Sequence, residues 1–303
     1  MGPQNTIRQL KQEEIDRQLW DKCISESENG LIYPTSIYLD HLADHWDGLV
    51  LNDYEAVMPL PWRKKFGLKY IYQPFLTAQL GVFGKKVDAP LVAEFFNAIP
   101  AQFRLIEFSL NYGNLFPLTQ LNLYIRTNFV LDLRPSYETL RDRYRENVQR
   151  NIEKSAKYGC FISNDVAIES VIELAKRQDD KSSGKDFASF AKLYGELKTR
   201  GAAVCYGVRT SKGELIASAA FLFSPERAYY LLVGNHPNGR TLGASHALID
   251  AFIRDHAGRN LVLDFEGSDI RNVAFFYSGF GAKEELYPAI KLNRLPALLR
   301  WLK

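Results

Sequence analysis

The sequence predicts an α+β protein built from two domains of similar layout, and three observations support this prediction. Short apolar strand patterns alternate with amphipathic helix patterns along all 303 residues. The two halves use similar strands and helices, which indicates a diverged duplication with domains over residues 1–128 and 129–303. In the second half, three strand patterns follow one another without a helix between them. This order is typical of a mixed, mostly antiparallel sheet flanked by helices.

The first half is expected to begin with helices and to continue mainly with short strands. The expected helices cover residues 15–23, 36–44 and 89–99, the last with Pro90 in its first turn. The expected strands cover residues 48–52, 55–62, 69–74, 79–83 and 103–110. A tight turn between the first two of these strands predicts a hairpin whose second strand contains Pro59.

The second half is expected to open with a strand over 129–133 and one long helix from about Ser136 to Gly159. Apolar side chains recur at every fourth position of this helix, at Leu140, Tyr144, Val148, Ile152 and Ala156. A short strand over 160–164 and two shorter helices over 168–176 and 187–199 follow. The remaining expected elements are strands at 202–209, 214–223 and 228–234, a helix at 244–256, a strand at 261–267, a helix at 269–281 and a strand at 284–290.

The composition is that of a globular protein. Hydrophobic residues make up 46% and charged residues 24%, and the net charge of +3 is too small to indicate a nucleic-acid partner by itself. Cys23, Cys160 and Cys205 are far apart and form no CxxC motif, so we expect free thiols and a cytoplasmic location. No apolar stretch approaches the ~20 residues of a membrane-spanning helix, and no signal-peptide pattern is present, so no membrane partner is expected.

The stretch GNHPNGRTLGASHALIDAF, residues 234–252, joins an apolar strand to a helix through a loop that contains glycines and an arginine. A helix N-terminus presents unpaired N–H groups and a partial positive charge, so it suits an anion. Gly243 permits close backbone approach, and Arg240 adds a guanidinium. These features predict a cradle for a phosphate-bearing cofactor. An ordinary strand-to-helix connection is the alternative.

Two carboxylates follow in the stretch LDFEGSDIRN. Asp264 and Glu266 are two residues apart on an expected strand, so their side chains should point the same way. Carboxylates in this arrangement can act as a general base or hold an amine substrate. In the alternative interpretation, Asp264 bonds to nearby backbone and Glu266 caps the next helix.

Two further charged patterns were considered as sites. The helix pattern RDRYRENVQRNIEK contains four arginines, which would suit tRNA, but the interleaved acidic residues favour a salt-bridged, solvated face. His41 and His45 are one helical turn apart. Leu42 stands where a zinc-protease helix has glutamate, and no third ligand is apparent, so no metal is expected.

The order of elements in the second half resembles the GNAT acyltransferase family, and two motifs support the resemblance. The GNAT pyrophosphate loop reads Gln/Arg-x-x-Gly-x-Gly/Ala, and RTLGAS fits it at Arg240 and Gly243 but departs at Ser245. The later GNAT helix often ends Tyr-x-x-x-Gly-Phe, and YSGFGA keeps Tyr277 and Gly281 but departs at Ala282.

A closer similarity is to the tandem-GNAT, Fem-type aminoacyltransferases and their soluble relatives. It rests on the arginine-rich YRENVQRNIEKSAKYG and on DFEGS followed by FFYSGFGA. The similarity covers most of residues 129–290, and the first half agrees in layout only. Fem enzymes that build peptidoglycan bridges carry a long helical arm in the second domain. Residues 160–200 contain patterns for only two short helices, which argues against peptidoglycan work.

The resemblance implies an N-acyltransferase that uses acetyl-CoA or another acyl-CoA, with a small-molecule or peptide amine bound between the two domains. Direct attack of the amine on a thioester needs a base, dipoles for the oxyanion and an acid for the thiolate. Tyr277 occupies the place of the GNAT general acid, although a core tyrosine among phenylalanines is the alternative. Asp264 and Glu266 are the candidate bases. The residues expected to bind the donor are Leu232, Val233, Gly234, Arg240, Thr241, Leu242, Gly243, Ala244 and Ser245.

Two other functions remain open at this point. One is Fem-like transfer from aminoacyl-tRNA, which predicts a basic channel and poor affinity for CoA. The other is a non-catalytic binding module that has kept the fold, which predicts no well-placed acid or base. Fold likeness alone cannot choose among these functions. The acceptor and the oligomeric state are not encoded in any recognisable pattern.

Overall fold

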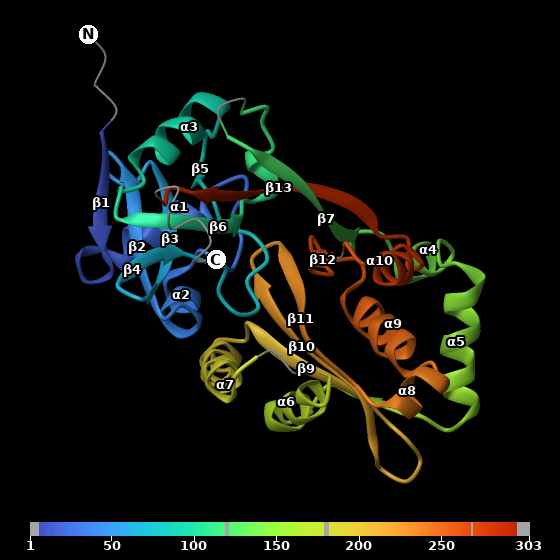
Figure 1. The fold of residues 1–303 in the computed structure, drawn as a ribbon. Coiled ribbons are helices and arrows are strands. Elements are labelled where there is room, and N and C mark those ends of the chain that lie inside the picture. The colour runs from blue at the N-terminus through green and yellow to red at the C-terminus, as the bar shows by residue number, and fades with distance from the viewer. Residues whose placement is uncertain (1–5, 119–120, 179–181, 268, 296–303) are drawn as a thin grey trace. The chain divides into compact units, whose positions relative to one another are not determined.

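A computed structural model describes residues 6–118, 121–178, 182–267 and 269–295 (Figure 1). Contacts divide the chain into two compact units. The first contains the chain up to Arg126 and again from Leu286, and the second is Thr127–Glu285. This division differs from the expected domains at the C-terminal end, where we had placed all residues to 303 in the second domain. The difference arises because the last strand pairs with a strand of the first unit, Ala289 opposite Ser109.

Over its described residues, the first unit is a mixed sheet with three α-helices. Its strands lie in the order β1 (Ile7–Lys11), β2 (His45–Leu51), β3 (Ala56–Lys65), β4 (Leu68–Ile71), β6 (Phe103–Ser109) and β13 (Lys283–Asn293), and β5 (Phe83–Gly84) pairs with β3. The helices are α1 (Arg17–Ser25), α2 (Ser36–Leu42) and α3 (Ala89–Ala98), with 3-10 turns at Gln12–Glu14 and Tyr112–Asn114. Strand β1 was not predicted. Its five residues, IRQLK, contain only two apolar side chains, which are three positions apart and so do not alternate as in a half-buried strand.

The second unit is a second mixed sheet covered by helices on both faces. Its strands lie in the order β7 (Leu123–Asp132), β12 (Val262–Asp264), β11 (Arg227–Asn235), β10 (Leu215–Ser224), β9 (Ala203–Arg209) and β8 (Phe161–Ser163). The helices are α4 (Tyr137–Arg141), α5 (Glu146–Lys157), α6 (Ile168–Lys176), α7 (Gly184–Thr199), α8 (Pro237–Thr241), α9 (Ala244–His256) and α10 (Arg271–Ser278). Figure 1 shows α6 and α7 on one face of β9–β11 and α9 on the other.

The predicted α+β class is confirmed, because each unit combines helices with a mixed, mostly antiparallel sheet. In the second unit, the sheet and α9 share one core. The rings of Phe221 and Phe252 stack with centroids 3.8 Å apart. Such aromatic contacts add to the free energy gained by burying the rings.

The single helix expected between Ser136 and Gly159 is wrong, because the segment forms two helices. Arg145 has an extended backbone (φ −63°, ψ 150°) and is the N-cap of α5. Its N–H donates to the carbonyl of Gly279 at 2.9 Å, outside either helix. The expected apolar stripe is buried at Leu140, Tyr144 and Val148, half-buried at Ile152, and exposed at Ala156. Apolar side chains at every fourth position predict which residues are buried, but they do not show that the helix is continuous. Residues on both sides of a helix break can pack against the same core.

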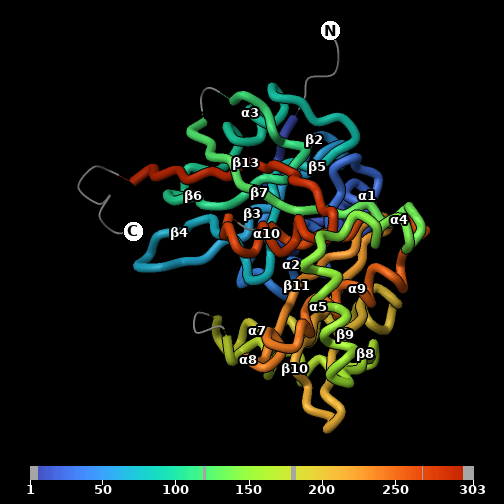
Figure 2. The backbone as a smooth tube through the Cα atoms, turned by 90° about the vertical axis from the view of Figure 1, so that its right-hand side faces the viewer, coloured from blue at the N-terminus to red at the C-terminus, as the bar shows by residue number. Residues whose placement is uncertain are grey.

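Gly243 has a structural role that the sequence did not reveal. Its φ is +70°, and a Cβ atom at this position would lie 2.2 Å from the carbonyl oxygen of Asn151 in α5. Helix α5 lies beside α9 at this point (Figure 2). Gly243 therefore allows the backbones of α5 and α9 to pack closely within the second unit. The sequence analysis had related the same glycine to a cofactor.

We predict that Gly243→Ala destabilises the protein more than Gly201→Ala. Both glycines have a positive φ, but no heavy atom lies within 4 Å of a Cβ at Gly201. The left-handed backbone should cost each variant about 1–2 kcal/mol. The clash with Asn151 should add about 1–3 kcal/mol at Gly243 alone. Urea unfolding of both variants measures the difference, and equal losses would contradict the packing role.

Candidate functional site

Strands β11 and β12 run side by side for three residues and then part. Their parallel pairing extends from Arg227 opposite Val262 to Tyr229 opposite Asp264. β12 ends at Asp264, whereas β11 continues to Asn235. The pairing of β11 with β10 also shifts register here, which leaves Leu231 as an extra residue in β11. A strand edge that loses its partner offers backbone N–H and C=O groups to an extended ligand.

The structure places the expected donor-binding residues around this divergence and at the start of α9. Leu232, Val233 and Gly234 lie on β11 after the point of divergence. The connection to α9 contains the short helix α8, so the segment expected to be a loop is partly helical. Arg240 and Thr241 are exposed there, whereas Gly243 and Ala244 are buried. Leu242 is half-buried and packs against the core, and the Ser245 hydroxyl donates to Asn235 Oδ1 at 2.6 Å.

The exposed residues of this segment that could contact an anion are therefore Arg240 and Thr241. A helix N-terminus and an exposed guanidinium both favour negative charge. The buried residues Gly243 and Ala244 contribute by holding the helix in place. The arrangement fits a phosphate-bearing ligand, and Gly243 itself is explained by helix packing.

Tyr277 lies on α10 and joins the aromatic cluster next to the divergence. Its ring stacks on Phe265 with centroids 4.7 Å apart and meets Tyr230 of β11 edge-on at 6.3 Å. Burial, together with the negative charges of Glu266 and Asp264, raises the pKa of Tyr277 above its ordinary value. The phenol therefore stays protonated at neutral pH. This position of Tyr277 is compatible both with a core residue and with a general acid. The ring packs in the aromatic cluster, and only the hydroxyl would take part in proton transfer.

Asp264 and Glu266 do not share one face of a strand, and this expectation is wrong. Strand β12 ends at Asp264, and Glu266 follows in a left-handed conformation with φ +61°. Asp264 is fully buried and accepts a hydrogen bond from the N–H of Glu266 at 2.8 Å. Glu266 is half-buried. The two carboxylates thus have different environments, although they are close in sequence.

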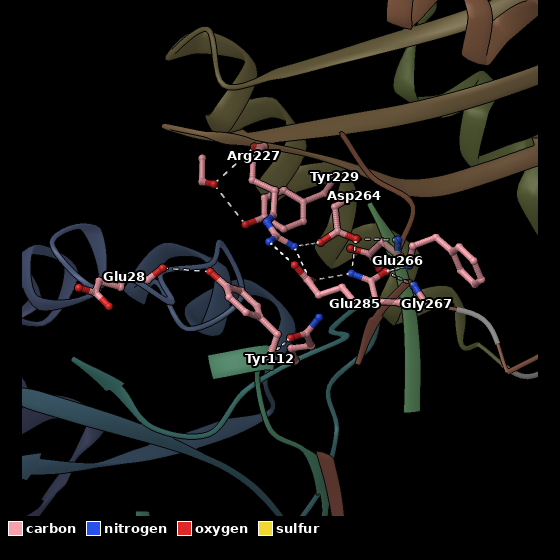
Figure 3. Close-up of polar contacts among 12 residues, drawn as sticks. Glu28, Tyr112, Arg227, Tyr229, Asp264, Glu266, Gly267 and Glu285 are labelled. Atoms are coloured by element: carbon pink, nitrogen blue, oxygen red, sulfur yellow. Dashed lines mark hydrogen bonds and ion pairs between the residues drawn. The ribbon is translucent and has the colours of Figure 1, made fainter. Parts of the chain in front are cut away.

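Asp264 belongs to a buried polar network that sequence reasoning missed (Figure 3). Arg227 donates to Asp264 Oδ2 at 2.6 Å and to both oxygens of Glu285 at 2.9 Å. Asn128 Nδ2 donates to Asp264 Oδ1 at 3.0 Å and to Glu285 Oε2 at 3.2 Å, while its Oδ1 accepts from the N–H of Gly267 at 2.7 Å. The only sequence signal was a charged residue, Arg227, at the head of an apolar strand.

The network fixes the end of β12 and the turn that carries Glu266. Burial raises the pKa of Asp264, and the Arg227 guanidinium opposes this shift. A buried guanidinium between two carboxylates is stable only as a complete set, since removing one member leaves an uncompensated buried charge. Asp264 therefore has the surroundings of a structural group.

His246 is a second residue that the sequence did not single out. It lies in the first turn of α9, half-buried, with its ring edge-on to Phe276 at 4.7 Å. Burial lowers the pKa of His246 to about 4. The imidazole is therefore neutral at pH 7, and it lies next to the helix that carries Tyr277.

Neither a metal site nor a membrane-spanning helix is found among residues 6–118, 121–178, 182–267 and 269–295. Among those residues, no group of three or more His, Cys, Asp or Glu side chains is arranged to hold a metal ion. No helix in the same part of the chain has the length and apolar character needed to cross a bilayer.

Comparisons with known proteins identify similar domains and folds. Residues 142–271 match the acetyltransferase (GNAT) domain family. No curated protein sequence matches the chain. Among solved structures, FemX has a TM-score of 0.67 at 13% identity, with 97% of this chain and 99% of that chain covered. A tandem GNAT protein from the clavulanic acid biosynthesis pathway has a TM-score of 0.57 at 12% identity, with 97% and 100% covered.

A further similar structure is L-PGS from Bacillus licheniformis, with a TM-score of 0.55, 13% identity and 93% of each chain covered. At these identities the structures establish a shared fold. The resemblance to tandem-GNAT, Fem-type proteins is confirmed at the level of the domain family and the fold.

We predict that His246 and His256 make the protein less stable in mild acid. Burial lowers the pKa of each to about 4 from an ordinary value of 6.5. Between these values the unfolded chain takes up protons that the folded protein does not, so the free energy of unfolding falls as the pH drops from 6.5 towards 4. Urea unfolding across this range should give a flatter pH dependence for a His246→Gln/His256→Gln variant. An unchanged slope would refute the assignment.

Proposed function

Because residues 142–271 match the GNAT domain family, we propose that this protein is an N-acyltransferase that moves an acyl group from acyl-CoA to an amine. The proposal rests mainly on one observation, the divergence of β11 from β12 next to the Tyr277 side chain. An extended donor can hydrogen-bond to the free edge of β11 at Leu232–Gly234. Its phosphates would then meet Arg240, Thr241 and the start of α9.

The chemistry needs one base and one acid. The amine nitrogen attacks the thioester carbon, so a C–N bond forms and the C–S bond breaks. We assign Glu266 as the base that takes the proton from the amine, and Tyr277 as the acid that protonates the departing thiolate. The phenol of Tyr277 is protonated at neutral pH, so it carries the proton that the departing thiolate takes up. Asp264 holds the backbone of Glu266 rather than the substrate.

Transfer from aminoacyl-tRNA is the second candidate function. The arginines around α5 favour it because most of them form no ion pair with another described residue. The salt-bridged face expected there is limited to Arg150 with Glu146 at 3.7 Å. Over the described residues, Arg141, Arg143 and Arg145 form no ion pair, and Arg145 instead lies over the ring of Phe275 at 4.6 Å. Exposed arginines without carboxylate partners suit a phosphate backbone.

We predict that acetyl-CoA or a longer acyl-CoA stabilises the fold. At 100 times its dissociation constant the ligand should add about 2.7 kcal/mol. Arg240→Ala should weaken binding about tenfold, because a charge-assisted bond to phosphate is lost. Arg259→Ala is a matched control, since it removes an exposed arginine of the same unit. Calorimetric titration decides the donor. Tight, salt-dependent tRNA binding without any response to CoA would favour aminoacyl transfer.

We predict that Tyr277→Phe lowers turnover by roughly 10²–10⁴-fold and leaves donor affinity unchanged, because only the acidic hydroxyl is lost. Tyr158→Phe removes a hydroxyl from an exposed tyrosine and should have no effect. Steady-state rates with an amine acceptor and donor titration together test the assignment. Wild-type turnover in Tyr277→Phe would make Tyr277 a core residue. Binding of CoA without turnover of any amine would favour a non-catalytic module.

A further inference from the structure

The hairpin between β3 and β4 ends in an unusual turn. Lys65 pairs with Leu68, so Phe66 and Gly67 form a two-residue connection. Both have a positive φ, +50° for Phe66 and +80° for Gly67. A two-residue turn with both φ values positive favours Asn-Gly or Asp-Gly. A phenylalanine in the left-handed region is strained, so turn formation does not explain Phe66.

Packing does not explain Phe66 either. Its side chain is 82% exposed, more than any other large hydrophobic side chain in the described part of the chain. Figure 2 shows the β3–β4 hairpin extending outward from the rest of the first unit. Neither turn formation nor packing therefore accounts for a strained aromatic residue at this tip.

The residues around Phe66 carry uncompensated positive charge. Lys64 and Lys65 are exposed and form no ion pair within the described ranges, and the Lys65 ammonium lies 5.6 Å from the centroid of the Phe66 ring. The ammonium of the half-buried Lys69 lies 3.9 Å from the centroid of the Trp62 ring. The nearby Arg63 is neutralised by Asp44 at 2.5 Å. Two exposed lysines therefore flank the tip, and they favour a negatively charged partner.

An apolar groove of about 640 Å³ lies beside the hairpin, on the same unit. Apolar side chains of β4, β6 and β13 line it, and so does the ion pair of Lys291 with Glu107 at 2.9 Å. Lys65 also lines the groove. The tip thus combines an exposed aromatic ring, positive charge and an apolar recess.

We propose that the β3–β4 tip docks the protein on an anionic membrane surface. Phe66 enters the interface between headgroups and acyl chains, where aromatic rings are favoured, and the lysines contact anionic headgroups. The expectation of no membrane partner rested on spanning segments, and surface docking needs none. A nucleic-acid strand is the less suitable partner, because sequence-tolerant binding uses several aromatic rings on which successive bases stack. The proposal is independent of the acyl donor.

Co-sedimentation with phosphatidylcholine vesicles, with and without phosphatidylglycerol, tests this proposal. We expect binding only when phosphatidylglycerol is present and weaker binding at high salt. Phe66→Asn creates the favoured Asn-Gly turn, so its unfolding midpoint should not fall, yet its vesicle binding should drop at least tenfold. Lys64→Glu/Lys65→Glu should also lower binding at least tenfold, because each lysine near an anionic surface contributes about fivefold.

Matched controls separate docking from general charge and apolarity. Phe161→Ser removes another exposed phenylalanine, and Lys86→Glu/Lys212→Glu makes the same charge change at exposed positions elsewhere. Both variants should bind vesicles as the wild type does. In Phe66→Trp, the tryptophan emission should shift to shorter wavelength with phosphatidylglycerol vesicles. Absence of vesicle binding, equal binding by Phe66→Asn, or binding of tRNA in place of vesicles would overturn the proposal.

Discussion

The guanidinium of Arg227 lies between the carboxylates of Asp264 and Glu285, and the candidate site depends on this buried ion set. Asn128 joins the two carboxylates and also accepts from the backbone after Glu266. These contacts tie the middle of β7 to the start of β11, the end of β12 and the start of β13 within the second unit. Because the set is buried, each charge needs the others, and loss of one member would cost about 3–5 kcal/mol. These contacts of Asp264 therefore fix the end of β12.

The end of β12 sets the position of both groups that we assign to chemistry. Past Asp264 the chain turns through Glu266 with a positive φ, and β11 continues alone. The same cluster of rings that packs Tyr277 also borders this edge of β11. Asp264 and Glu266 illustrate how environment divides two neighbouring carboxylates. One is saturated by charged and polar partners, and the other is half-buried next to a phenol.

Gly243 and Phe66 both have a positive φ, but the reason for this backbone conformation differs between them. At Gly243 a positive φ and a close contact with Asn151 lock α9 against α5, so glycine is required by packing. At Phe66 a positive φ is imposed on a bulky residue that has no packing role, which indicates a function outside the unit. The distinction follows from what surrounds each residue. Neither local motif contains that information.

By itself, the sequence determined most of the helices and strands of the second unit, the start of α9 at Ala244 and the resemblance to GNAT proteins. These features depend on local periodicity, glycine positions and short motifs. Only the tertiary structure decided where the helix after Ser136 breaks, which strand pairs with β13, and what Arg227, Asp264 and Glu266 contact. The physical reason is that local patterns record whether a residue is buried. The partner that satisfies a buried backbone group or charge comes from a distant part of the chain.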